Sequence, residues 1–151
     1  MDHIAIMSKD WGLTLKIASG QKTIESRWYK NRSAPWGKIS PGDAIYFKDS
    51  GEPIVLKATV SKILQFENLT PNIINGLLRQ YGERIGLTDS DLPRYYQRFK
   101  DKRYCLLMFL EDVQPVRPFY ISKAGYGAMA AWLCIPAIER LILPIGEPYH
   151  R

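Results

Sequence analysis

Three charged residues lie within six positions near the start of the chain: Lys22, Glu25 and Arg27. If the segment 23–28 is a β-strand, its side chains alternate between two faces, so Glu25 and Arg27 share one face about 7 Å apart. A carboxylate offers only hydrogen-bond acceptors, whereas a guanidinium offers a planar fork of donors. The pair could therefore hold a flat polar ligand, or it could be a surface ion pair that contributes little to stability.

Strict alternation along this strand sends Lys22 to the opposite face. Lys22 reaches the same ligand only if the chain is still turning at Gly20 and Gln21. With all three charged side chains in one cleft, a base could be recognised by its polar edge, and Glu25 could accept from an amino group such as that of cytosine. Two catalytic alternatives use the same cleft. Lys22 could be a base whose pKa is lowered by burial and by Arg27, or Glu25 could activate a water while the two cations stabilise an oxyanion.

Other residues could complete such a site. Lys48 and Ser50 lie at the end of the next predicted strand, although the simpler interpretation of both is a surface turn. Tyr126, Trp28 or Trp11 could provide a ring on which a base stacks. Each of these aromatic residues is more often part of a hydrophobic core than of a binding surface.

The charge balance points to the class of partner. The chain carries 21 Lys and Arg against 15 Asp and Glu, a net charge of +6. Such an excess favours an anionic partner, most often nucleic acid, although many small proteins are basic without one. Positive charge gathers in the aromatic loop 29–41 and on one face of a predicted helix at 90–100, and either could track a phosphate backbone. The loop could equally cover the core with Trp36, and the helix face could simply be solvated.

The remaining composition sets further bounds. At 151 residues the chain can bury one hydrophobic core, and we expect a single domain over 1–151. Cys105 and Cys134 lie in apolar runs without metal-ligand spacing, so neither a metal nor another cofactor is expected. The first ten residues lack the apolar region of a secretory signal, and no apolar run of about 18 residues could span a membrane. We expect a cytoplasmic protein without a membrane partner, and the sequence favours no particular oligomeric state.

Periodicity predicts the elements that must position these residues. Strand-like runs occupy residues 4–7, 23–28, 44–48, 53–66, 103–118 and part of 132–143. Helices are predicted from Ser8 or Asp10 to Gly20, from Thr70 to Gly82 and from Ser90 to Lys100. Strands and helices do not alternate as in a doubly wound fold. A mixed α+β fold is therefore expected, a small twisted β-barrel with inserted and flanking helices.

One apparent motif is rejected. Residues 125–130 match the dinucleotide-binding pattern G-x-G-x-x-A. The βαβ unit in which that pattern works does not precede it, and too little chain follows it. The glycines on either side of Tyr126 instead predict a tight turn or a close approach of the backbone.

Four segments, taken in order, resemble the ASCH domain (activating-signal-cointegrator homology), a member of the PUA-like group. The first is G-x-K-T-I-E-x-R at residues 20–27, which follows an opening strand and helix. The others are the Pro-Gly-Asp turn and strand at 41–47, the strand at 103–107, and the glycine-containing segment 125–132. Together they extend the resemblance over residues 3–143, nearly the whole chain.

The resemblance implies a PUA-like β-barrel with a cleft across its mouth, lined by Lys22, Glu25 and Arg27. Related folds bind RNA or modified bases, so the expected function is an RNA- or nucleotide-binding domain that reads a base in this cleft. The ligand would be RNA, another single-stranded nucleic acid or a nucleoside.

The alternative is a small hydrolase with Lys22 and Glu25 as catalytic residues, since one branch of the family resembles an amidohydrolase acting on acylated cytidine and another is ribonuclease-like. The amidohydrolase branch uses a Thr three residues after the Lys as its nucleophile. In this sequence Glu25 stands at that position, and Thr23 lies two residues earlier. A protein-interaction domain is a third class of function, for which no sequence feature speaks.

Overall fold

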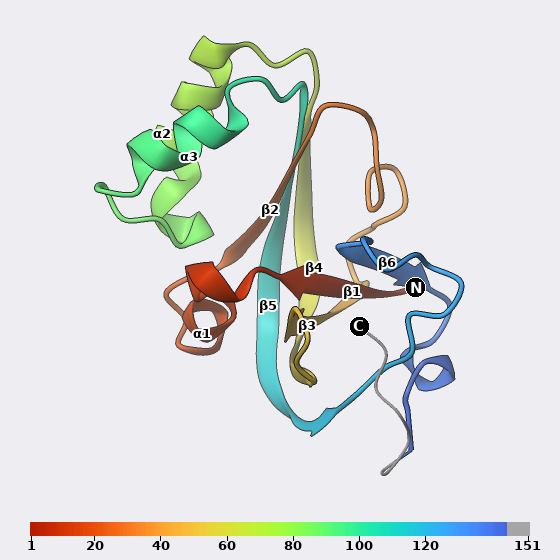
Figure 1. Cartoon of the computed structure of the whole chain (residues 1–151). Helices are drawn as coiled ribbons and strands as arrows, with labels where there is room; N and C mark the ends of the chain where they lie inside the picture. Colours follow the sequence, from red (N-terminus) through yellow and green to blue (C-terminus); the bar gives the residue numbers. More distant parts are fainter. Residues whose placement is uncertain (145–151) are drawn as a thin grey trace.

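Figure 1 shows a computed structural model of the chain, which describes residues 1–144. Its strands are β1 (Asp2–Met7), β2 (Ile24–Tyr29), β3 (Ala44–Asp49), β4 (Ile54–Phe66), β5 (Tyr104–Phe119) and β6 (Trp132–Ile135). Its α-helices are α1 (Leu13–Ala18), α2 (Pro71–Ile85) and α3 (Leu92–Phe99), and two short 3-10 helices are η1 (Lys9–Trp11) and η2 (Ile138–Arg140). None of the described helices is both long enough and apolar enough to cross a membrane.

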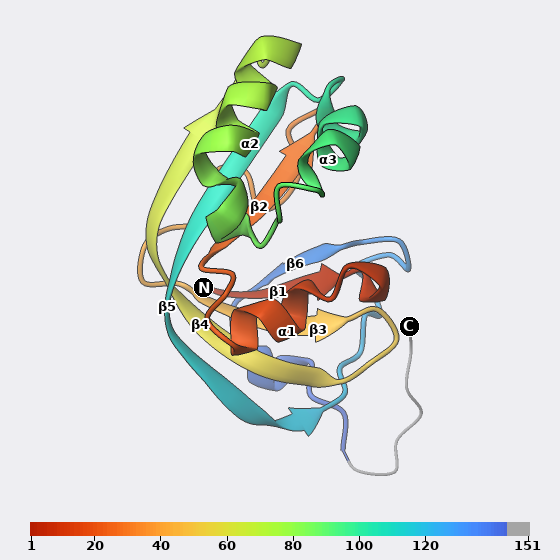
Figure 2. The same ribbon diagram turned by 90° about the vertical axis from the view of Figure 1, so that its left-hand side faces the viewer.

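The strands form one sheet in the order β2-β5-β4-β3-β1-β6. Neighbouring strands are antiparallel except β1 and β3, which run parallel. The long strands β4 and β5 bend as they cross the molecule, and the sheet wraps into a half-barrel (Figure 2). Three register shifts between β4 and β5 accompany this bend, as β-bulges do. The expected mixed α+β architecture, a small twisted sheet with inserted and flanking helices, is confirmed. Within the described residues β2 and β6 form the two edges of the sheet.

Helices α2 and α3 cover the end of the sheet formed by β2 and β5 (Figures 1 and 2). Their buried side chains form one core cluster with Ile24 and Trp28 of β2 and Leu107 of β5. A second core cluster lies inside the half-barrel around Phe47 and Met108. Because side chains alternate along β2, Glu25 and Arg27 face away from the helices.

The structure confirms the predicted start of α2 and corrects its end. The Thr70 hydroxyl accepts a hydrogen bond from the Ile73 N–H at 3.3 Å, and Pro71 occupies the first turn. The predicted end at Gly82 is wrong, because the helix continues to Ile85 and ends at Gly86, whose φ is 103°. Gly82 lies inside the helix instead, where a Cβ would come 2.9 Å from Leu92 Cδ2, the end of a flexible side chain at the start of α3 that can shift to make room.

Candidate functional site

The connection between α1 and β2 turns Lys22 toward the interior. Gly20 has a positive φ of 82°, which glycine adopts without steric cost. The Lys22 N–H then donates to Lys16 O at 2.9 Å, and the Thr23 N–H donates to Arg84 O at 2.8 Å. These bonds place residues 22 and 23 before the strand, so the alternation that sends Lys22 to the opposite face does not apply to it.

The Lys22 ammonium is completely enclosed, with a side chain that is 0% exposed. Its Nζ donates to Ile24 O at 2.5 Å and to Ile85 O at 2.8 Å, and it forms an ion pair with Glu25 Oε1 at 3.2 Å. An ammonium has three protons to donate, and these three acceptors take all of them. Lys22 is therefore a support beneath Glu25 rather than a group at the surface of a cleft.

Glu25 stands between the two cations. Its Oε1 also accepts from the Ser26 N–H at 3.0 Å, and its Oε2 accepts from Arg27 Nη2 at 3.0 Å. Burial tends to raise the pKa of Glu25, but the charges of Lys22 and Arg27 outweigh it and hold that pKa below its usual value of 4.5. Burial lowers the pKa of Lys22, against the opposing attraction of Glu25. The structure thus brings the three predicted charged residues into one connected group.

Arg27 crosses the open side of the half-barrel, from β2 toward β6. Its Nη1 donates to Ala131 O at 3.3 Å, directly before β6, and its Nη2 contacts Met7 Sδ at 3.4 Å. The guanidinium also lies over the Trp132 ring, 5.0 Å from the ring centre. One side chain therefore joins the two edge strands that the hydrogen-bonded sheet leaves apart.

The ring beneath Arg27 is itself held in place. Trp132 Nε1 donates to Nδ1 of the buried His3 at 3.1 Å, and His3 Nε2 lies 2.9 Å from Asp43 Oδ2. Burial lowers the pKa of His3 in spite of the neighbouring Asp43 carboxylate. A neutral His3 with its proton on Nε2 satisfies both contacts, because it donates to Asp43 and accepts from Trp132.

A hollow of about 360 Å³, called the first hollow, lies between β2, the 7–13 segment and the end of α3. Glu25 and Arg27 form part of its lining, whereas Lys22 is absent from the described lining residues. Four aromatic residues, Trp11, Trp28, Tyr29 and Phe99, also line it. Trp28 and Phe99 stack with ring centres 4.8 Å apart. The hollow thus combines aromatic walls with one carboxylate, Glu25, and two guanidinium groups, Arg27 and Arg98.

A second hollow of about 590 Å³ lies on the other side of the end of β1. The two hollows share the lining residues Ile6, Met7, Ser8 and Ala131. Ser50, which the sequence assigned to the candidate site, lines the second hollow and not the first.

The remaining predicted residues lie elsewhere. Lys48 is buried on β3, where burial lowers its pKa and Glu52 opposes that shift. Tyr126 is 38% exposed in the turn after Lys123 and does not belong to the described lining of either hollow. The structure therefore groups Glu25 and Arg27 in one hollow with Lys22 behind them, and it separates Lys48 and Tyr126 from that group.

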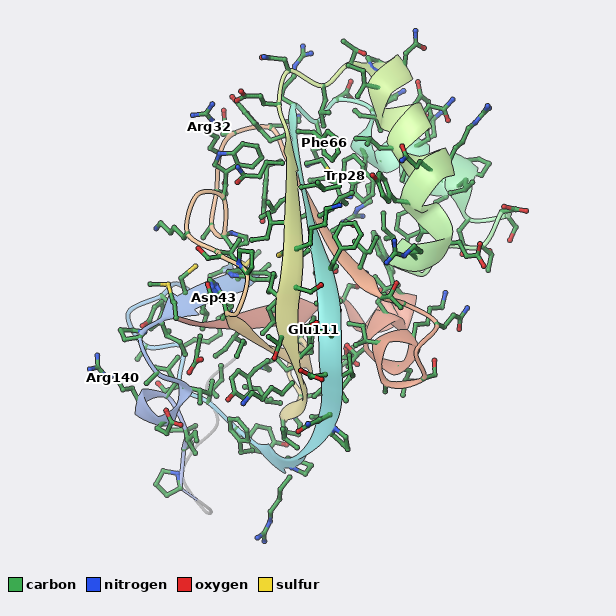
Figure 3. The ribbon with its side chains drawn as sticks, turned by 180° about the vertical axis from the view of Figure 1, so that it is seen from behind. Trp28, Arg32, Asp43, Phe66, Glu111 and Arg140 are labelled. Carbon is green, nitrogen blue, oxygen red and sulfur yellow. The ribbon has the colours of Figure 1, made fainter. Side chains whose placement is uncertain are left out.

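Apart from Tyr29, the basic loop 29–41 contributes no residue to the described lining of the first hollow. Arg32 forms an ion pair with Glu67 at 2.6 Å and lies over the Tyr104 ring, while Trp36 packs edge-on against the same ring. Figure 3 shows Arg32 on the opposite side of the long strands from the helices, whereas Trp28 lies between the sheet and the helices. This loop acts as a cover over the core, the second of the two interpretations given by its sequence.

The structure places two further residues, Arg98 and Lys123, at the hollows, although the sequence did not assign them to the candidate site. Arg98, predicted as one cation of a basic helix face, lines the first hollow, and its guanidinium lies 4.5 Å from the centre of the Trp11 ring. Lys123 is buried beside the second hollow and donates to Ala128 O and Ala130 O, each at 2.9 Å. The basic face of residues 90–100 was a signal for Arg98. Lys123 had none, because its partners are backbone carbonyls of a loop.

Known proteins similar to this chain are found through structure rather than sequence. No protein-family model and no curated protein matches the chain by sequence. The crystal structure of an ASCH protein from Zymomonas mobilis superposes with a TM-score of 0.57 and 21% identity, covering 78% of this chain and 71% of that one. A mutant of the same protein gives the same TM-score and identity, covering 78% of this chain and 73% of its own. A protein from Enterococcus faecalis superposes with a TM-score of 0.50 and 15% identity, covering 74% and 76% of the two chains.

These similarities confirm the resemblance drawn from the four sequence segments at the level of the fold: the chain has the ASCH fold.

Proposed function

We propose that this chain binds RNA, another single-stranded nucleic acid or a nucleoside, and that the first hollow accommodates one base. The observation that carries the proposal is the composition of that hollow. The partly exposed rings of Trp11 and Tyr29 offer surface on which a base can stack, and Arg27 offers donors beside them. The Glu25 carboxylate lines the same hollow with a side chain that is 3% exposed. Arg98 adds a cation beside the Trp11 ring.

The hydrogen-bonding capacity of the pair supports recognition of a base edge. A carboxylate accepts about four hydrogen bonds, and the contacts to Lys22, Ser26 and Arg27 use three of them. The capacity that is left suits the amino group of a base such as cytosine. Arg27 has five N–H donors, and its contacts within the described residues leave donors for a base carbonyl or a phosphate.

The hydrolase alternative has less support from this geometry. A Lys22 base would have to be neutral and reachable, but the Lys22 ammonium is enclosed and donates to three acceptors. A Glu25 base would be weakened by its two cationic neighbours, which hold the pKa of its carboxyl low. Both groups are better suited to forming a fixed ion pair than to exchanging protons.

The test is a binding measurement with short single-stranded RNA oligonucleotides of each base, followed by fluorescence anisotropy. Trp11→Leu removes one stacking wall and should weaken binding about tenfold, the size of one base-stacking contact. Arg98→Gln should weaken it about fivefold, as expected for one cation beside a ring and a phosphate chain. Because Trp11 also packs edge-on against Tyr95, Trp11→Phe should restore most of the affinity if stacking is the cause.

Arg94→Gln is the matched control, because Arg94 is exposed on the same helix and pairs with Asp91 at 3.5 Å. Equal losses for Arg94→Gln and Arg98→Gln would mean that only general charge attracts the RNA and that the hollow plays no part. Failure of the unaltered protein to bind any of the oligonucleotides would refute the proposal. Turnover of an N4-acylated cytidine by the unaltered protein would replace it with the hydrolase alternative.

A further inference from the structure

We propose that the second hollow binds the phosphate of the nucleotide whose base occupies the first hollow, so that the ligand is a nucleotide or a longer strand. This inference rests on the proposed function, because it assigns a second part of the same ligand to a neighbouring site. Four observations carry it: the shared wall, the contrast in lining, the position of Lys123, and the charges that surround it.

The two hollows share a wall, to which the end of β1, the following Ser8, and Ala131 directly before β6 all contribute. The Ile6 N–H donates to Ala131 O at 3.0 Å, and Arg27 Nη1 donates to the same oxygen at 3.3 Å. A base held near Arg27 therefore has its attached sugar and phosphate within reach of the second hollow.

The first hollow is lined in part by aromatic residues and the second in part by polar ones, which matches the flat base and the charged phosphate of a nucleotide. The first hollow has four aromatic residues, whereas the described lining of the second has none. The second hollow instead presents the hydroxyls of the exposed Ser8 and Ser50 and the ammonium of Lys123. Hydroxyls and ammonium groups are donors that suit a phosphate, and a surface without rings offers nothing for a base to stack on.

Lys123 is the cation placed to receive the phosphate. Two of its three protons go to Ala128 O and Ala130 O, which leaves one for a ligand. Burial lowers the pKa of Lys123, and the charge of the nearby Lys48 lowers it further. Lys48 thus adds a second positive charge near the hollow, which Glu52 partly offsets.

The other charged residues that line this hollow, Lys9 and Asp10, affect how strongly it can bind an anion. Lys9 lines the hollow and forms an ion pair with the exposed Glu52, so much of its charge is already neutralised. Asp10 is the one acidic residue among the described residues that line this hollow. If an anion binds here, Asp10 opposes it, and removing that charge should strengthen binding.

The experiment compares the four nucleosides with their 5′- and 3′-monophosphates by isothermal titration calorimetry at low salt. The measured quantity is the ratio of the two affinities for the same base. A monophosphate should bind about tenfold more tightly than its nucleoside, the size of one hydrogen bond to a charged group. Whichever of the 5′ and 3′ forms gains affinity shows the direction of the chain through the site.

Variants of the second hollow should change that ratio. Lys123→Met should remove most of the gain, and Lys123→Arg should retain part of it. Asp10→Asn should increase the ratio. Lys62→Met is the matched control, because Lys62 is exposed on β4, where its ammonium lies over the Phe109 ring, and it should leave the ratio unchanged.

Ser50 provides a test that does not depend on the contacts of Lys123 within the loop. Ser50→Asp places a negative charge at the hollow and should lower the ratio, whereas Ser50→Asn, of similar size and neutral, should lower it much less. A fold defect would weaken nucleoside and monophosphate alike and would leave the ratio as it was.

The outcomes separate the two proposals. If nucleosides bind but neither monophosphate gains affinity, the second hollow does not take the phosphate and the proposed function stands. If a monophosphate gains affinity but Lys123→Met, Ser50→Asp and Asp10→Asn leave the ratio unchanged, the phosphate lies elsewhere and the inference is wrong. If neither nucleosides nor oligonucleotides bind, the proposed function fails first.

Discussion

Two buried lysines lie next to the two hollows, Lys22 beside the first and Lys123 in the lining of the second, and they differ in whether an ion pair neutralises their charge. Each donates to two backbone carbonyls, Lys22 to Ile24 and Ile85 and Lys123 to two carbonyls of the 123–131 loop. Lys22 also pairs with the Glu25 carboxylate, whereas no ion pair of Lys123 is found among the described residues. The charge of Lys22 is therefore neutralised within the protein, and that of Lys123 is not.

This difference separates a lysine that supports a site from one to which we assign a ligand contact. A buried ion pair is costly to break, because removing one partner leaves the other charge without compensation. Lys22 fixes the carboxylate of Glu25 at the edge of the first hollow and has no proton left for a substrate. Lys123 fixes a loop and keeps a proton and an uncompensated charge. Burial alone would have assigned the two residues the same role.

The largest expected effect concerns stability. Lys22→Met leaves Glu25 buried with Arg27 as its remaining cationic partner, and we expect the free energy of unfolding to fall by about 3–5 kcal/mol. Lys123→Met removes two hydrogen bonds from a charged donor, but it strands no carboxylate and relieves the burial of an unpaired charge, so a smaller loss of about 1.5–3 kcal/mol is expected. Urea unfolding followed by tryptophan fluorescence measures both changes.

Lys30→Met is the control for this measurement, because Lys30 is exposed at the end of β2. It should change the free energy of unfolding by no more than about 0.5 kcal/mol. Equal losses for the Lys22 and Lys123 variants would contradict the distinction between a paired and an unpaired buried lysine.

Local patterns in the sequence predict much of this fold. The alternation in residues 23–28 places Glu25 and Arg27 on one face, and Thr70 with Pro71 marks the start of α2 because capping depends on neighbours in the chain. The end of α2 was missed because Gly82 lies within the helix, and nothing in the local sequence distinguishes it from Gly86, at which the helix ends.

The site is predicted less completely for the same reason. Lys22 joins Glu25 because the backbone N–H groups of residues 22 and 23 donate to Lys16 O and Arg84 O, which holds the chain out of the strand. Arg98 reaches the first hollow through the packing of α3 against β2, and Lys123 depends on carbonyl groups, which every residue has. Tertiary contacts of this kind leave no periodic mark in the sequence.

Acid should selectively reduce the stability that comes from the ion pairs of Glu25 with Lys22 and Arg27. The pKa of Glu25 in the folded protein lies below its usual value of 4.5, so between these two pKa values the unfolded chain binds more protons than the folded one. The stability contributed by the ionised Glu25 is therefore fully present above pH 4.5 and is lost as the pH falls through the folded-state pKa. Glu25→Gln should consequently show a shallower loss of stability in this range, measured by urea unfolding at a series of pH values.

Glu83→Gln is the matched control, because Glu83 is exposed on α2. It should follow the acid limb of the unaltered protein. A Glu25→Gln variant whose stability falls as steeply as that of the control would show that the acid limb arises from other carboxylates, such as Asp43 and Asp91, whose pKa values also lie below their usual range.

The smallest expected effect is the most direct measure of which lysine meets the ligand. For single strands, each phosphate contact contributes about 0.7 to the slope of log affinity against log salt concentration. Lys123→Met should therefore reduce the magnitude of this slope by about 0.7 for a short RNA.

Lys22→Met should lower the affinity but leave the slope unchanged, because the ammonium of Lys22 is neutralised by Glu25 and touches no phosphate. Both variants are compared by fluorescence anisotropy at a temperature at which each is folded. A change of slope in the Lys22 variant, with none in the Lys123 variant, would reverse the roles assigned to the two residues.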